Sequence, residues 1–549
     1  MPSKEHLVSN SPTLHSTRRG RCAVLVLMAI VGTAMVATFE RYHLLNDACQ
    51  YESTARNIRD GNGVSTSCIF YGEQFAAGTV PAPQTVFPPF FPAAMAAVSA
   101  VSGSELHHVA FTLNLVSFLL SALVLYELCI CLGSRPLGGV VSVACWLATA
   151  VLWHTTWWGL SEPPFMLLIL ISVRLLAVRR LSFALLAGLC ASAAIGVRYA
   201  GLFLVAAAAV NYAILLICSR DKRLISEALL FGIPPTVTAW VLLRRNLQLV
   251  GSVEGGNTYE LGDSLQTVVV RLVASGTELF GIPRSFLLSG SAAEYVAAVT
   301  ITIGTLLVSR FLADRERRHQ TLKFLGDPVR LLTIVFPAVH LAATTYLEYS
   351  RGSGISQRMI MPVLPFTMAL FAALVAQVKQ PRRSSFFVTL TCGVLTCGFA
   401  MGQYNAYHNL DDEAPASPIL HKMLQAEISD GETVEEFLYS EISDSEPLLV
   451  NQPQLVYGIL KRPVIGLATG RYNTAGVPWT PERVDAEIIS KYGVRYVLLA
   501  KGARVIDRHT SQFFKEQNQG KVPPTFHCVF ENQDLILFEL TEPIRSSSL

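Results

Sequence analysis

Residues 46–92 follow the first hydrophobic segment of the chain and read NDACQYESTARNIRDGNGVSTSCIFYGEQFAAGTVPAPQTVFPPFFP. Asp47 opens an amphipathic turn that contains Tyr51, the glycines at 61 and 63 break it, and the prolines and aromatics of 88–92 lead into a second apolar run. An acid just beyond a hydrophobic segment is common. An acid followed by a helical turn, a glycine-rich break and a proline-aromatic re-entry is less common, so this loop is the first candidate for a functional site.

The composition of the chain indicates a membrane protein. Its 549 residues are 51% hydrophobic and only 15% charged, with a mean hydropathy of +0.41. A soluble globular domain is typically about 25% charged. The formal net charge of +3 is too small to suggest nucleic-acid binding. We therefore expect an integral membrane protein that contacts lipids and binds no nucleic acid.

Apolar runs long enough to cross about 30 Å of hydrocarbon recur along the chain. About eleven are predicted, at 22–39, 109–132, 138–153, 163–178, 181–197, 200–218, 224–243, 295–312, 331–347, 359–378 and 386–402. For the first run a cleaved signal peptide is the alternative, but no small-residue cleavage site precedes Glu40. Residues 90–101 are apolar but too short to span, and they predict an interfacial or re-entrant helix.

The distribution of positive charge predicts the orientation. With residues 1–21 as a cytoplasmic tail, all six inner segments carry Arg or Lys, as inner loops of membrane proteins do. An odd number of spans then places everything after Gly402 outside. The prediction is a polytopic α-helical membrane domain at 22–402 with a large first outer loop at 40–108, in the plasma or inner membrane.

Residues 403–549 differ in composition from the rest of the chain. Strand-like runs occur at 447–450, 464–467 and 494–500, with a hairpin pattern at 526–539. Helical patterns lie between them, at 454–460 and 481–492. Strands that alternate with helices predict a small α/β domain, which the orientation makes extracytoplasmic.

Two of the eleven cysteines, Cys49 and Cys68, lie in the first outer loop. In an oxidising compartment they could form a disulfide that pins the loop, and two free thiols are the alternative. The sequence leaves this choice open. The cysteines form no CxxC pair and no Cys/His spacing typical of zinc sites.

Ionisable residues at the outer ends of the predicted spans are the candidates for chemistry, because lone polar groups are costly in lipid. Asp47 follows the first span, and a solvated acid next to the membrane is its alternative role. Glu162, in Ser161-Glu162-Pro163, opens the fourth span. Helix capping is an alternative for Glu162, since the helix dipole stabilises an acid there. A carboxylate in either place can accept a proton from a reacting group.

Arg198 and Arg358 lie on the outer side, where positive charge is statistically disfavoured. A planar guanidinium binds phosphate oxygens in a bidentate manner, and it can neutralise charge that builds on a departing phosphate. Contact with phospholipid headgroups is the alternative. Arg351 is a further candidate for the same role.

Aromatic and histidine side chains lie near the same span ends. His154 is surrounded by Trp153, Trp157 and Trp158, which could form an interfacial belt or stack on a sugar. The pair at 107–108 reads as two interfacial histidines, because a metal role would need a partner acid and the sequence fixes none. No cofactor is expected; a divalent metal is compatible with this reading but not indicated by it.

The order of these motifs resembles the GT-C glycosyltransferases, multi-span enzymes that take sugars from polyprenyl-phosphate carriers. Protein O-mannosyltransferases and the lipid A aminoarabinose transferase are familiar members. The matching features are the acidic first loop, the Ser-Glu-Pro loop at 161–163, the Arg-Tyr turn at 198–199, a span at 240–251 that ends in Arg-Arg-Asn and Gly, the Arg-x-x-x-Pro-x-x-Pro motif from Arg358, and the outer α/β domain.

One departure from the family concerns the first loop. Members often carry an acidic pair, or an acid followed by a basic residue, whereas here Asn46 precedes Asp47 and Ala48 follows it. Asp47 therefore carries the acidic role alone, with Glu52 as the nearest substitute.

The resemblance implies an enzyme that transfers a sugar, with inversion, from a polyprenyl-phosphate donor to a lipid, glycan or protein acceptor at the outer face. It implies Asp47 as the base and Glu162 as its support. The expected substrate-binding residues are Arg198, Arg358, Arg351, Tyr51 and His154. A transporter is the alternative from another class, but it would show broken spans repeated in two halves, and no such symmetry is present. A non-catalytic envelope-assembly protein is the third reading.

Overall fold

The structure is a computed structural model, and it describes most of the chain. The described residues are 14–39, 47–70, 78–219, 221–253, 264–278, 327–351, 356–377, 424, 427–429, 432–467, 488–500, 526–531 and 535–541. The predicted spans at 295–312 and 386–402 lie outside them, as do the first residues of the predicted helix at 481–492.

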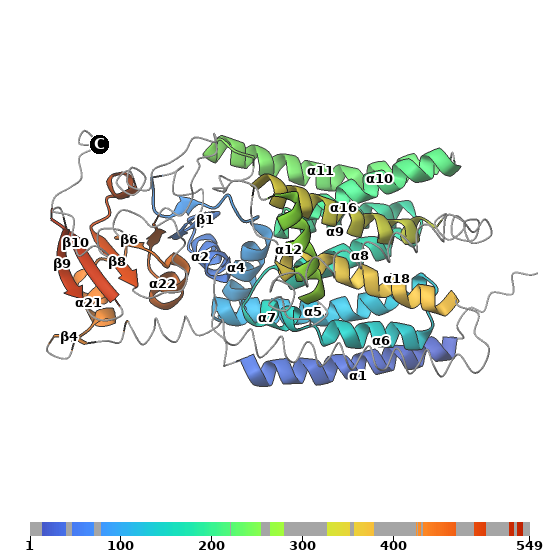
Figure 1. The fold of residues 1–549 in the computed structure, drawn as a ribbon, viewed down its shortest axis with the longest axis horizontal. Coiled ribbons are helices and arrows are strands. Elements are labelled where there is room, and N and C mark those ends of the chain that lie inside the picture. The colour runs from blue at the N-terminus through green and yellow to red at the C-terminus, as the bar shows by residue number, and fades with distance from the viewer. Residues whose placement is uncertain are drawn as a thin grey trace, which may run out of the picture.

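A helical bundle makes up the larger part of the molecule, and most of its helices run along the long axis in Figure 1. Its helices are α1 (Leu14–Thr38), α5 (Leu106–Cys131), α6 (Pro136–Leu147), α7 (Ala150–Trp157), α8 (Glu162–Leu176), α9 (Leu181–Val197), α10 (Gly201–Ser219), α11 (Arg223–Val250), α12 (Leu265–Glu278), α16 (Pro328–Arg351), α17 (Gln357–Ile360) and α18 (Leu364–Gln377).

Six helical segments of the described residues are long and apolar enough to cross a membrane: α1, α5, α10, α11, α16 and the run from α17 into α18. Helices α6 and α7, which meet at a 52° bend, add a seventh if they are one span. Helices α8 and α9 lie at two further predicted spans, and their 15 and 17 residues are below and at the lower end of the range of about 17 to 25 residues for a crossing helix, so they are not counted among the six. The described part of the chain thus accounts for six or seven of the eleven expected spans.

Helices α9 and α11 pack with their backbones in close approach. Pro235 lies inside α11 and has no N–H to donate to the carbonyl of Phe231, four residues earlier. Gly188 of α9 lies against that carbonyl, and a Cβ at this position would be 2.4 Å from the Phe231 oxygen. Only glycine fits there, so the proline-containing turn of α11 and Gly188 form one packing unit.

The segment between α1 and α5, which the sequence analysis predicted as the first outer loop, contains two helices that cover one end of the bundle (Figure 1). Helix α2 (Asp47–Arg59) is buried along most of its length, and α4 (Phe90–Ser102) packs against it. The glycine break after α2 is real: Gly61 and Gly63 have φ of +85° and +70°, which glycine adopts without strain. Helix α4 confirms the helix predicted at 90–101.

Among the described residues, six strands form a mixed sheet beyond these helices, in the order β2-β7-β6-β8-β10-β9. Its strands are β2 (Cys68–Ile69), β6 (Leu448–Val450), β7 (Val464–Gly466), β8 (Tyr496–Ala500), β9 (Phe526–Glu531) and β10 (Leu535–Leu540). Helix α22 (Pro453–Leu460) connects β6 to β7. The strands predicted at 447–450, 464–467, 494–500 and 526–539 and the helix at 454–460 all form.

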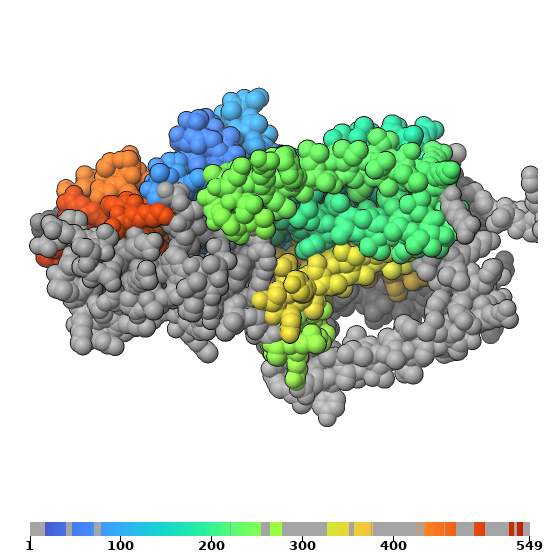
Figure 2. All heavy atoms as spheres, turned by 90° about the horizontal axis from the view of Figure 1, so that it is seen from above, coloured from blue at the N-terminus to red at the C-terminus, as the bar shows by residue number. Residues whose placement is uncertain are grey.

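The edge strand β2 does not come from the C-terminal part of the chain. It belongs to the loop between α1 and α5 and pairs in parallel with β7, with Cys68 opposite Val464. Figure 2 shows the blue segments of this loop beside the orange and red C-terminal segments on one side and the green α11 on the other. The first loop is thus built into both the bundle and the sheet.

Candidate functional site

Arg358 contacts both predicted carboxylates. Its Nη2 atom donates to Oδ2 of Asp47 at 2.9 Å, and its Nε atom donates to Oε1 of Glu162 at 2.7 Å. The three residues come from the starts of α2 and α8 and from the short helix α17, which are far apart in the sequence. The fold therefore brings into direct contact three residues that the sequence analysis expected to act together.

Arg198 binds the same carboxylate from another side. Its Nη1 atom lies 2.8 Å from Oε1 of Glu162 and donates to Oγ of Ser161 at 3.2 Å. The hydroxyl groups of Tyr51 and Ser161 are 2.9 Å apart and share a hydrogen bond. We call the six connected residues the carboxylate–arginine cluster; they are Asp47, Tyr51, Ser161, Glu162, Arg198 and Arg358.

Local structure explains where the cluster residues lie. Asp47 and Glu162 are each the first residue of a helix, where the positive end of the helix dipole stabilises a carboxylate. Arg198 follows the last residue of α9 in extended backbone, with φ −149° and ψ 134°, so its side chain leaves the helix end. Glu162 therefore has both the helix-terminal position expected of a capping acid and the arginine partners expected of a functional one.

The two acids differ in exposure. The side chain of Glu162 is 2% exposed, whereas that of Asp47 is 18% exposed, and those of Arg358 and Arg198 are 25% and 26% exposed. A buried carboxylate is tolerated when it is paired and hydrogen-bonded. Glu162 thus holds the two guanidinium groups from inside the protein, while Asp47 and the arginines are reachable from solvent.

Tyr51 supports the cluster from α2. Its ring is buried and packs edge-on against Phe87 and Phe91, with centroids 5.0 and 5.4 Å away. Burial raises the pKa of the Tyr51 phenol, so the hydroxyl stays neutral and serves as a hydrogen-bond partner of Ser161.

A second set of polar residues holds the first loop next to the cluster. Arg245 donates to the carbonyl oxygens of Gln84 at 2.7 Å and Val64 at 3.1 Å. Asn246 donates to the hydroxyl of Tyr199 at 2.8 Å and to the carbonyl of Thr85. The end of α11 is thereby attached to two separate stretches of the loop.

Sequence reasoning assigned no role to Ser161, Arg245 or Asn246. Ser161 stands beside Glu162, and its hydroxyl can be recognised as a link only once Tyr51 and Arg198 are known to meet there. Arg245 could have been found by the argument used for Arg358, because it too is an arginine at a span end predicted to face outward.

The other predicted site residues lie outside the carboxylate–arginine cluster or outside the described part of the structure. His154 is buried in α7 among aromatic rings, with its centroid 5.2 Å from Trp158 and 5.8 Å from Trp157. Trp157 is itself buried, so it packs inside the bundle rather than in a surface belt. Arg351 ends α16, and its side chain lies outside the described part of the structure. Glu52, the substitute acid, is paired with a lysine and an arginine.

No disulfide joins the two first-loop cysteines in this structure. Both Cys49 and Cys68 are fully buried and keep their thiols. Burial raises the pKa of Cys49 to about 12, which leaves it protonated at neutral pH. Of the two alternatives left open by the sequence, the structure has the unlinked pair.

Comparison with known proteins gives a match in fold. No protein-family model matches the chain, and no curated protein is significantly similar to it in sequence. The crystal structure of ArnT from Cupriavidus metallidurans bound to undecaprenyl phosphate aligns with a TM-score of 0.55 and 13% identity, over 94% of this chain and 97% of that chain. The chain has the GT-C fold.

Two other GT-C structures agree with this assignment. An oligosaccharyltransferase of Archaeoglobus fulgidus aligns with a TM-score of 0.53 and 11% identity, over 87% of this chain and 68% of that chain. The arabinofuranosyltransferase AftD from Mycobacteria aligns with a TM-score of 0.51 and 12% identity, over 96% of this chain and 40% of that chain. Together with the six or seven apolar helical segments among the described residues, the GT-C fold supports an integral membrane protein.

Proposed function

We propose that this protein is a membrane glycosyltransferase that takes a sugar from a polyprenyl-phosphate donor and transfers it, with inversion, to an acceptor at the end of the bundle covered by α2 and α4. The observation that carries the proposal is the contact of Arg358 with both Asp47 and Glu162. In support of the donor class, the ArnT structure with the same fold contains undecaprenyl phosphate.

The two arginines are the groups that would bind the donor phosphate. Both contact the same oxygen of Glu162, so their guanidinium groups converge on one place. Each guanidinium has five N–H donors, and the contacts described above use only some of them. Both side chains are partly exposed, so a phosphate can approach them and form charge-assisted hydrogen bonds.

Asp47 is the group that would accept the proton of the acceptor. It is the more exposed of the two carboxylates, and Arg358 orients it. In the reaction, the acceptor oxygen attacks the anomeric carbon from the side opposite the phosphate. The bond from that carbon to the phosphate oxygen breaks, the electron pair leaves with the phosphate, and the acceptor proton passes to Asp47. The arginines stabilise the charge that develops on the phosphate.

The donor class can be tested with purified protein in nanodiscs. We expect thermal stabilisation by undecaprenyl phosphate but not by undecaprenol, and release of polyprenyl phosphate from a matching polyprenyl-phosphate sugar. Arg358→Lys keeps the charge but loses the fork geometry, so the apparent affinity for undecaprenyl phosphate should fall about tenfold or more. Arg21→Lys is the matched control. Arg21 is an exposed arginine that also makes two hydrogen bonds to a carboxylate, that of Glu127, and this variant should bind undecaprenyl phosphate as the wild type does.

Equal stabilisation by the lipid alcohol and the lipid phosphate would contradict phosphate recognition. Binding without any sugar transfer from a panel of donors would instead favour a carrier-lipid transporter or an assembly protein over an enzyme.

A further inference from the structure

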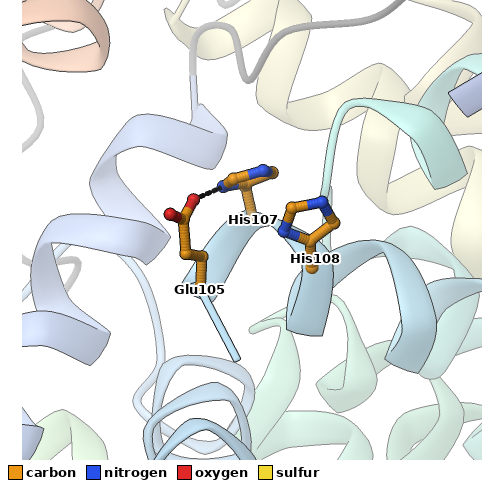
Figure 3. A group of neighbouring side chains, drawn as sticks. All are labelled: Glu105, His107 and His108. Atoms are coloured by element: carbon orange, nitrogen blue, oxygen red, sulfur yellow. Dashed lines mark ion pairs between the residues drawn. The ribbon is translucent and has the colours of Figure 1, made fainter. Parts of the chain in front are cut away.

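Three side chains with metal-binding atoms meet outside the carboxylate–arginine cluster. They are Glu105, His107 and His108, at the start of α5 where it packs against α2 and α4 (Figure 3). One ligand atom from each residue lies within 4.8 Å of the other two. Among the described residues, no other three His, Cys, Asp or Glu side chains meet this closely. The structure supplies the partner acid that the sequence did not fix.

We infer that Glu105, His107 and His108 form a binding site for a divalent transition-metal ion, with Zn²⁺ as the best fit. Two imidazole nitrogens and one carboxylate oxygen are a donor set that zinc uses in proteins. Ca²⁺ and Mg²⁺ prefer sites made of oxygen atoms, so the two imidazoles disfavour them. Three protein ligands also leave a fourth tetrahedral position for water or another molecule.

The separation of two of the ligand atoms already suits a tetrahedral metal. Nδ1 of His107 lies 3.2 Å from Oε2 of Glu105. With bonds of about 2.0 Å to nitrogen and oxygen, the ligand atoms of tetrahedral zinc are about 3.3 Å apart. The third ligand atom is a ring nitrogen of His108. It would need to move inward by about 1.5 Å at most, and because His108 is exposed its side chain has room to rotate that far.

Aromatic packing keeps the two imidazoles together. Phe39, just after α1, stacks on His107 with centroids 6.4 Å apart and contacts His108 edge-on at 5.6 Å. Phe39 is itself stacked on Phe111 one turn further along α5, at 3.9 Å. The imidazole rings are 3.9 Å from each other. Because this packing already limits the motion of the rings, the two side chains lose less conformational entropy when a metal binds.

The site is accessible to an ion from solution. The side chain of Glu105 is 75% exposed and that of His107 is 36% exposed. Figure 3 shows Glu105 paired with His107. A histidine nitrogen binds a metal ion only when it carries no proton, so Zn²⁺ binding should weaken at acidic pH.

The test is a metal titration of the full-length protein, prepared without a histidine tag and held in nanodiscs. Co²⁺ is the probe, because a tetrahedral site gives it a visible absorption band, and Zn²⁺ should displace it with one-to-one stoichiometry. The double variant His107→Ala/His108→Ala loses two ligands, and we expect at least a 100-fold loss of Zn²⁺ affinity. The matched control is His527→Ala, an exposed histidine on β9, which should bind as the wild type does.

Glu105→Gln provides a second measurement that does not depend on the double variant being folded. It changes one exposed side chain, keeps its shape and removes its charge, and we expect Zn²⁺ affinity to fall about tenfold or more. The inference is overturned if the wild type gives no tetrahedral Co²⁺ band. It is also overturned if Glu105→Gln and the double variant bind Zn²⁺ as tightly as His527→Ala.

Discussion

Arg358 is the residue on which the candidate site depends. From its position at a predicted outer span end, the sequence analysis expected it to bind phosphate. The structure places its guanidinium between Asp47 and Glu162. Phosphate binding stays a prediction, and these contacts are compatible with it, because a guanidinium that is held by carboxylates keeps its charge, its orientation and part of its donor capacity.

The four charged residues of the site could be selected from sequence because ionisable groups at span ends are costly and few. Their mutual contacts could not, because contact depends on which helix ends meet in space. Asp47 and Arg358 are 311 positions apart, and no periodic pattern links them. The same reason explains why Ser161 was quoted in a motif but given no role.

The first prediction at this scale concerns Asp47. Asp47→Asn keeps the size of the side chain but removes the proton acceptor, so turnover should fall about 10²- to 10⁴-fold. Affinity for the donor should change much less, because the base acts mainly in the transition state. Single-turnover transfer and donor binding, measured on the same preparation, separate the two quantities.

Asp60→Asn is the matched control for this measurement. Asp60 follows the same helix α2 and is half-exposed in a surface pair with Arg59, so its loss should leave turnover unchanged. Wild-type turnover in Asp47→Asn would exclude the proposed base. Glu52 is then a poor substitute, because it is buried between Lys461 and Arg56.

At the scale of elements, the structure shows what hydrophobic runs can and cannot predict. Runs of suitable length located α1, α5, α10, α11, α16 and α18. They also located α8 and α9, although these helices are short. The single span predicted at 138–153 corresponds to two helices, α6 and α7, and composition does not reveal the bend between them at Ala148–Thr149. The strand β2 was missed because two residues carry no detectable alternation.

The packing of α9 on α11 gives a prediction for stability. Gly188→Ala puts a methyl group 2.4 Å from the backbone oxygen of Phe231, so the helices must separate. Overpacking of this kind costs about 1–3 kcal/mol, and the melting temperature in detergent should fall. Gly232→Ala is the matched control: it lies next to Phe231 in α11, and a methyl group there would have nothing within 4 Å among the described residues.

Gly232→Ala should leave the melting temperature unchanged or raise it slightly, because alanine favours a helix over glycine by about 0.5–1 kcal/mol. Equal behaviour of the two variants would mean that α9 and α11 are not in close contact.

At the scale of the whole molecule, the first loop joins the bundle to the sheet. Strand β2 extends the sheet, and Glu52 of α2 pairs with Lys461, which directly follows α22, at 2.7 Å. The sequence analysis treated 22–402 and 403–549 as separate domains, and that division stays a prediction. What it did not foresee is that a segment of the first would supply an edge strand to the sheet built mainly from the second.

Removing the lysine tests this connection. Lys461→Ala takes one of two cations away from the carboxylate of Glu52, which is 3% exposed, and leaves the ion pair with Arg56. We expect faster hydrogen exchange in β2 and α22, while α9 and α11 keep their protection. Arg495→Ala, which breaks an exposed pair with Glu539 inside the sheet, is the control and should not affect β2. Unchanged exchange in β2 would show that the pair does not hold the loop to the sheet.

The carboxylate–arginine cluster contains equal numbers of positive and negative charges, and this balance has a consequence for the proposed reaction. Two carboxylates and two guanidiniums sum to zero before a donor arrives. A donor phosphodiester carries a single negative charge, and the phosphomonoester released from it carries about −1.5 to −2 at pH 7. The charge that the phosphate gains is nearly the charge that Asp47 loses on taking up the acceptor proton. Arg358 would then only exchange one counter-ion for another, and the interior of the site would keep almost the same net charge from substrate to product.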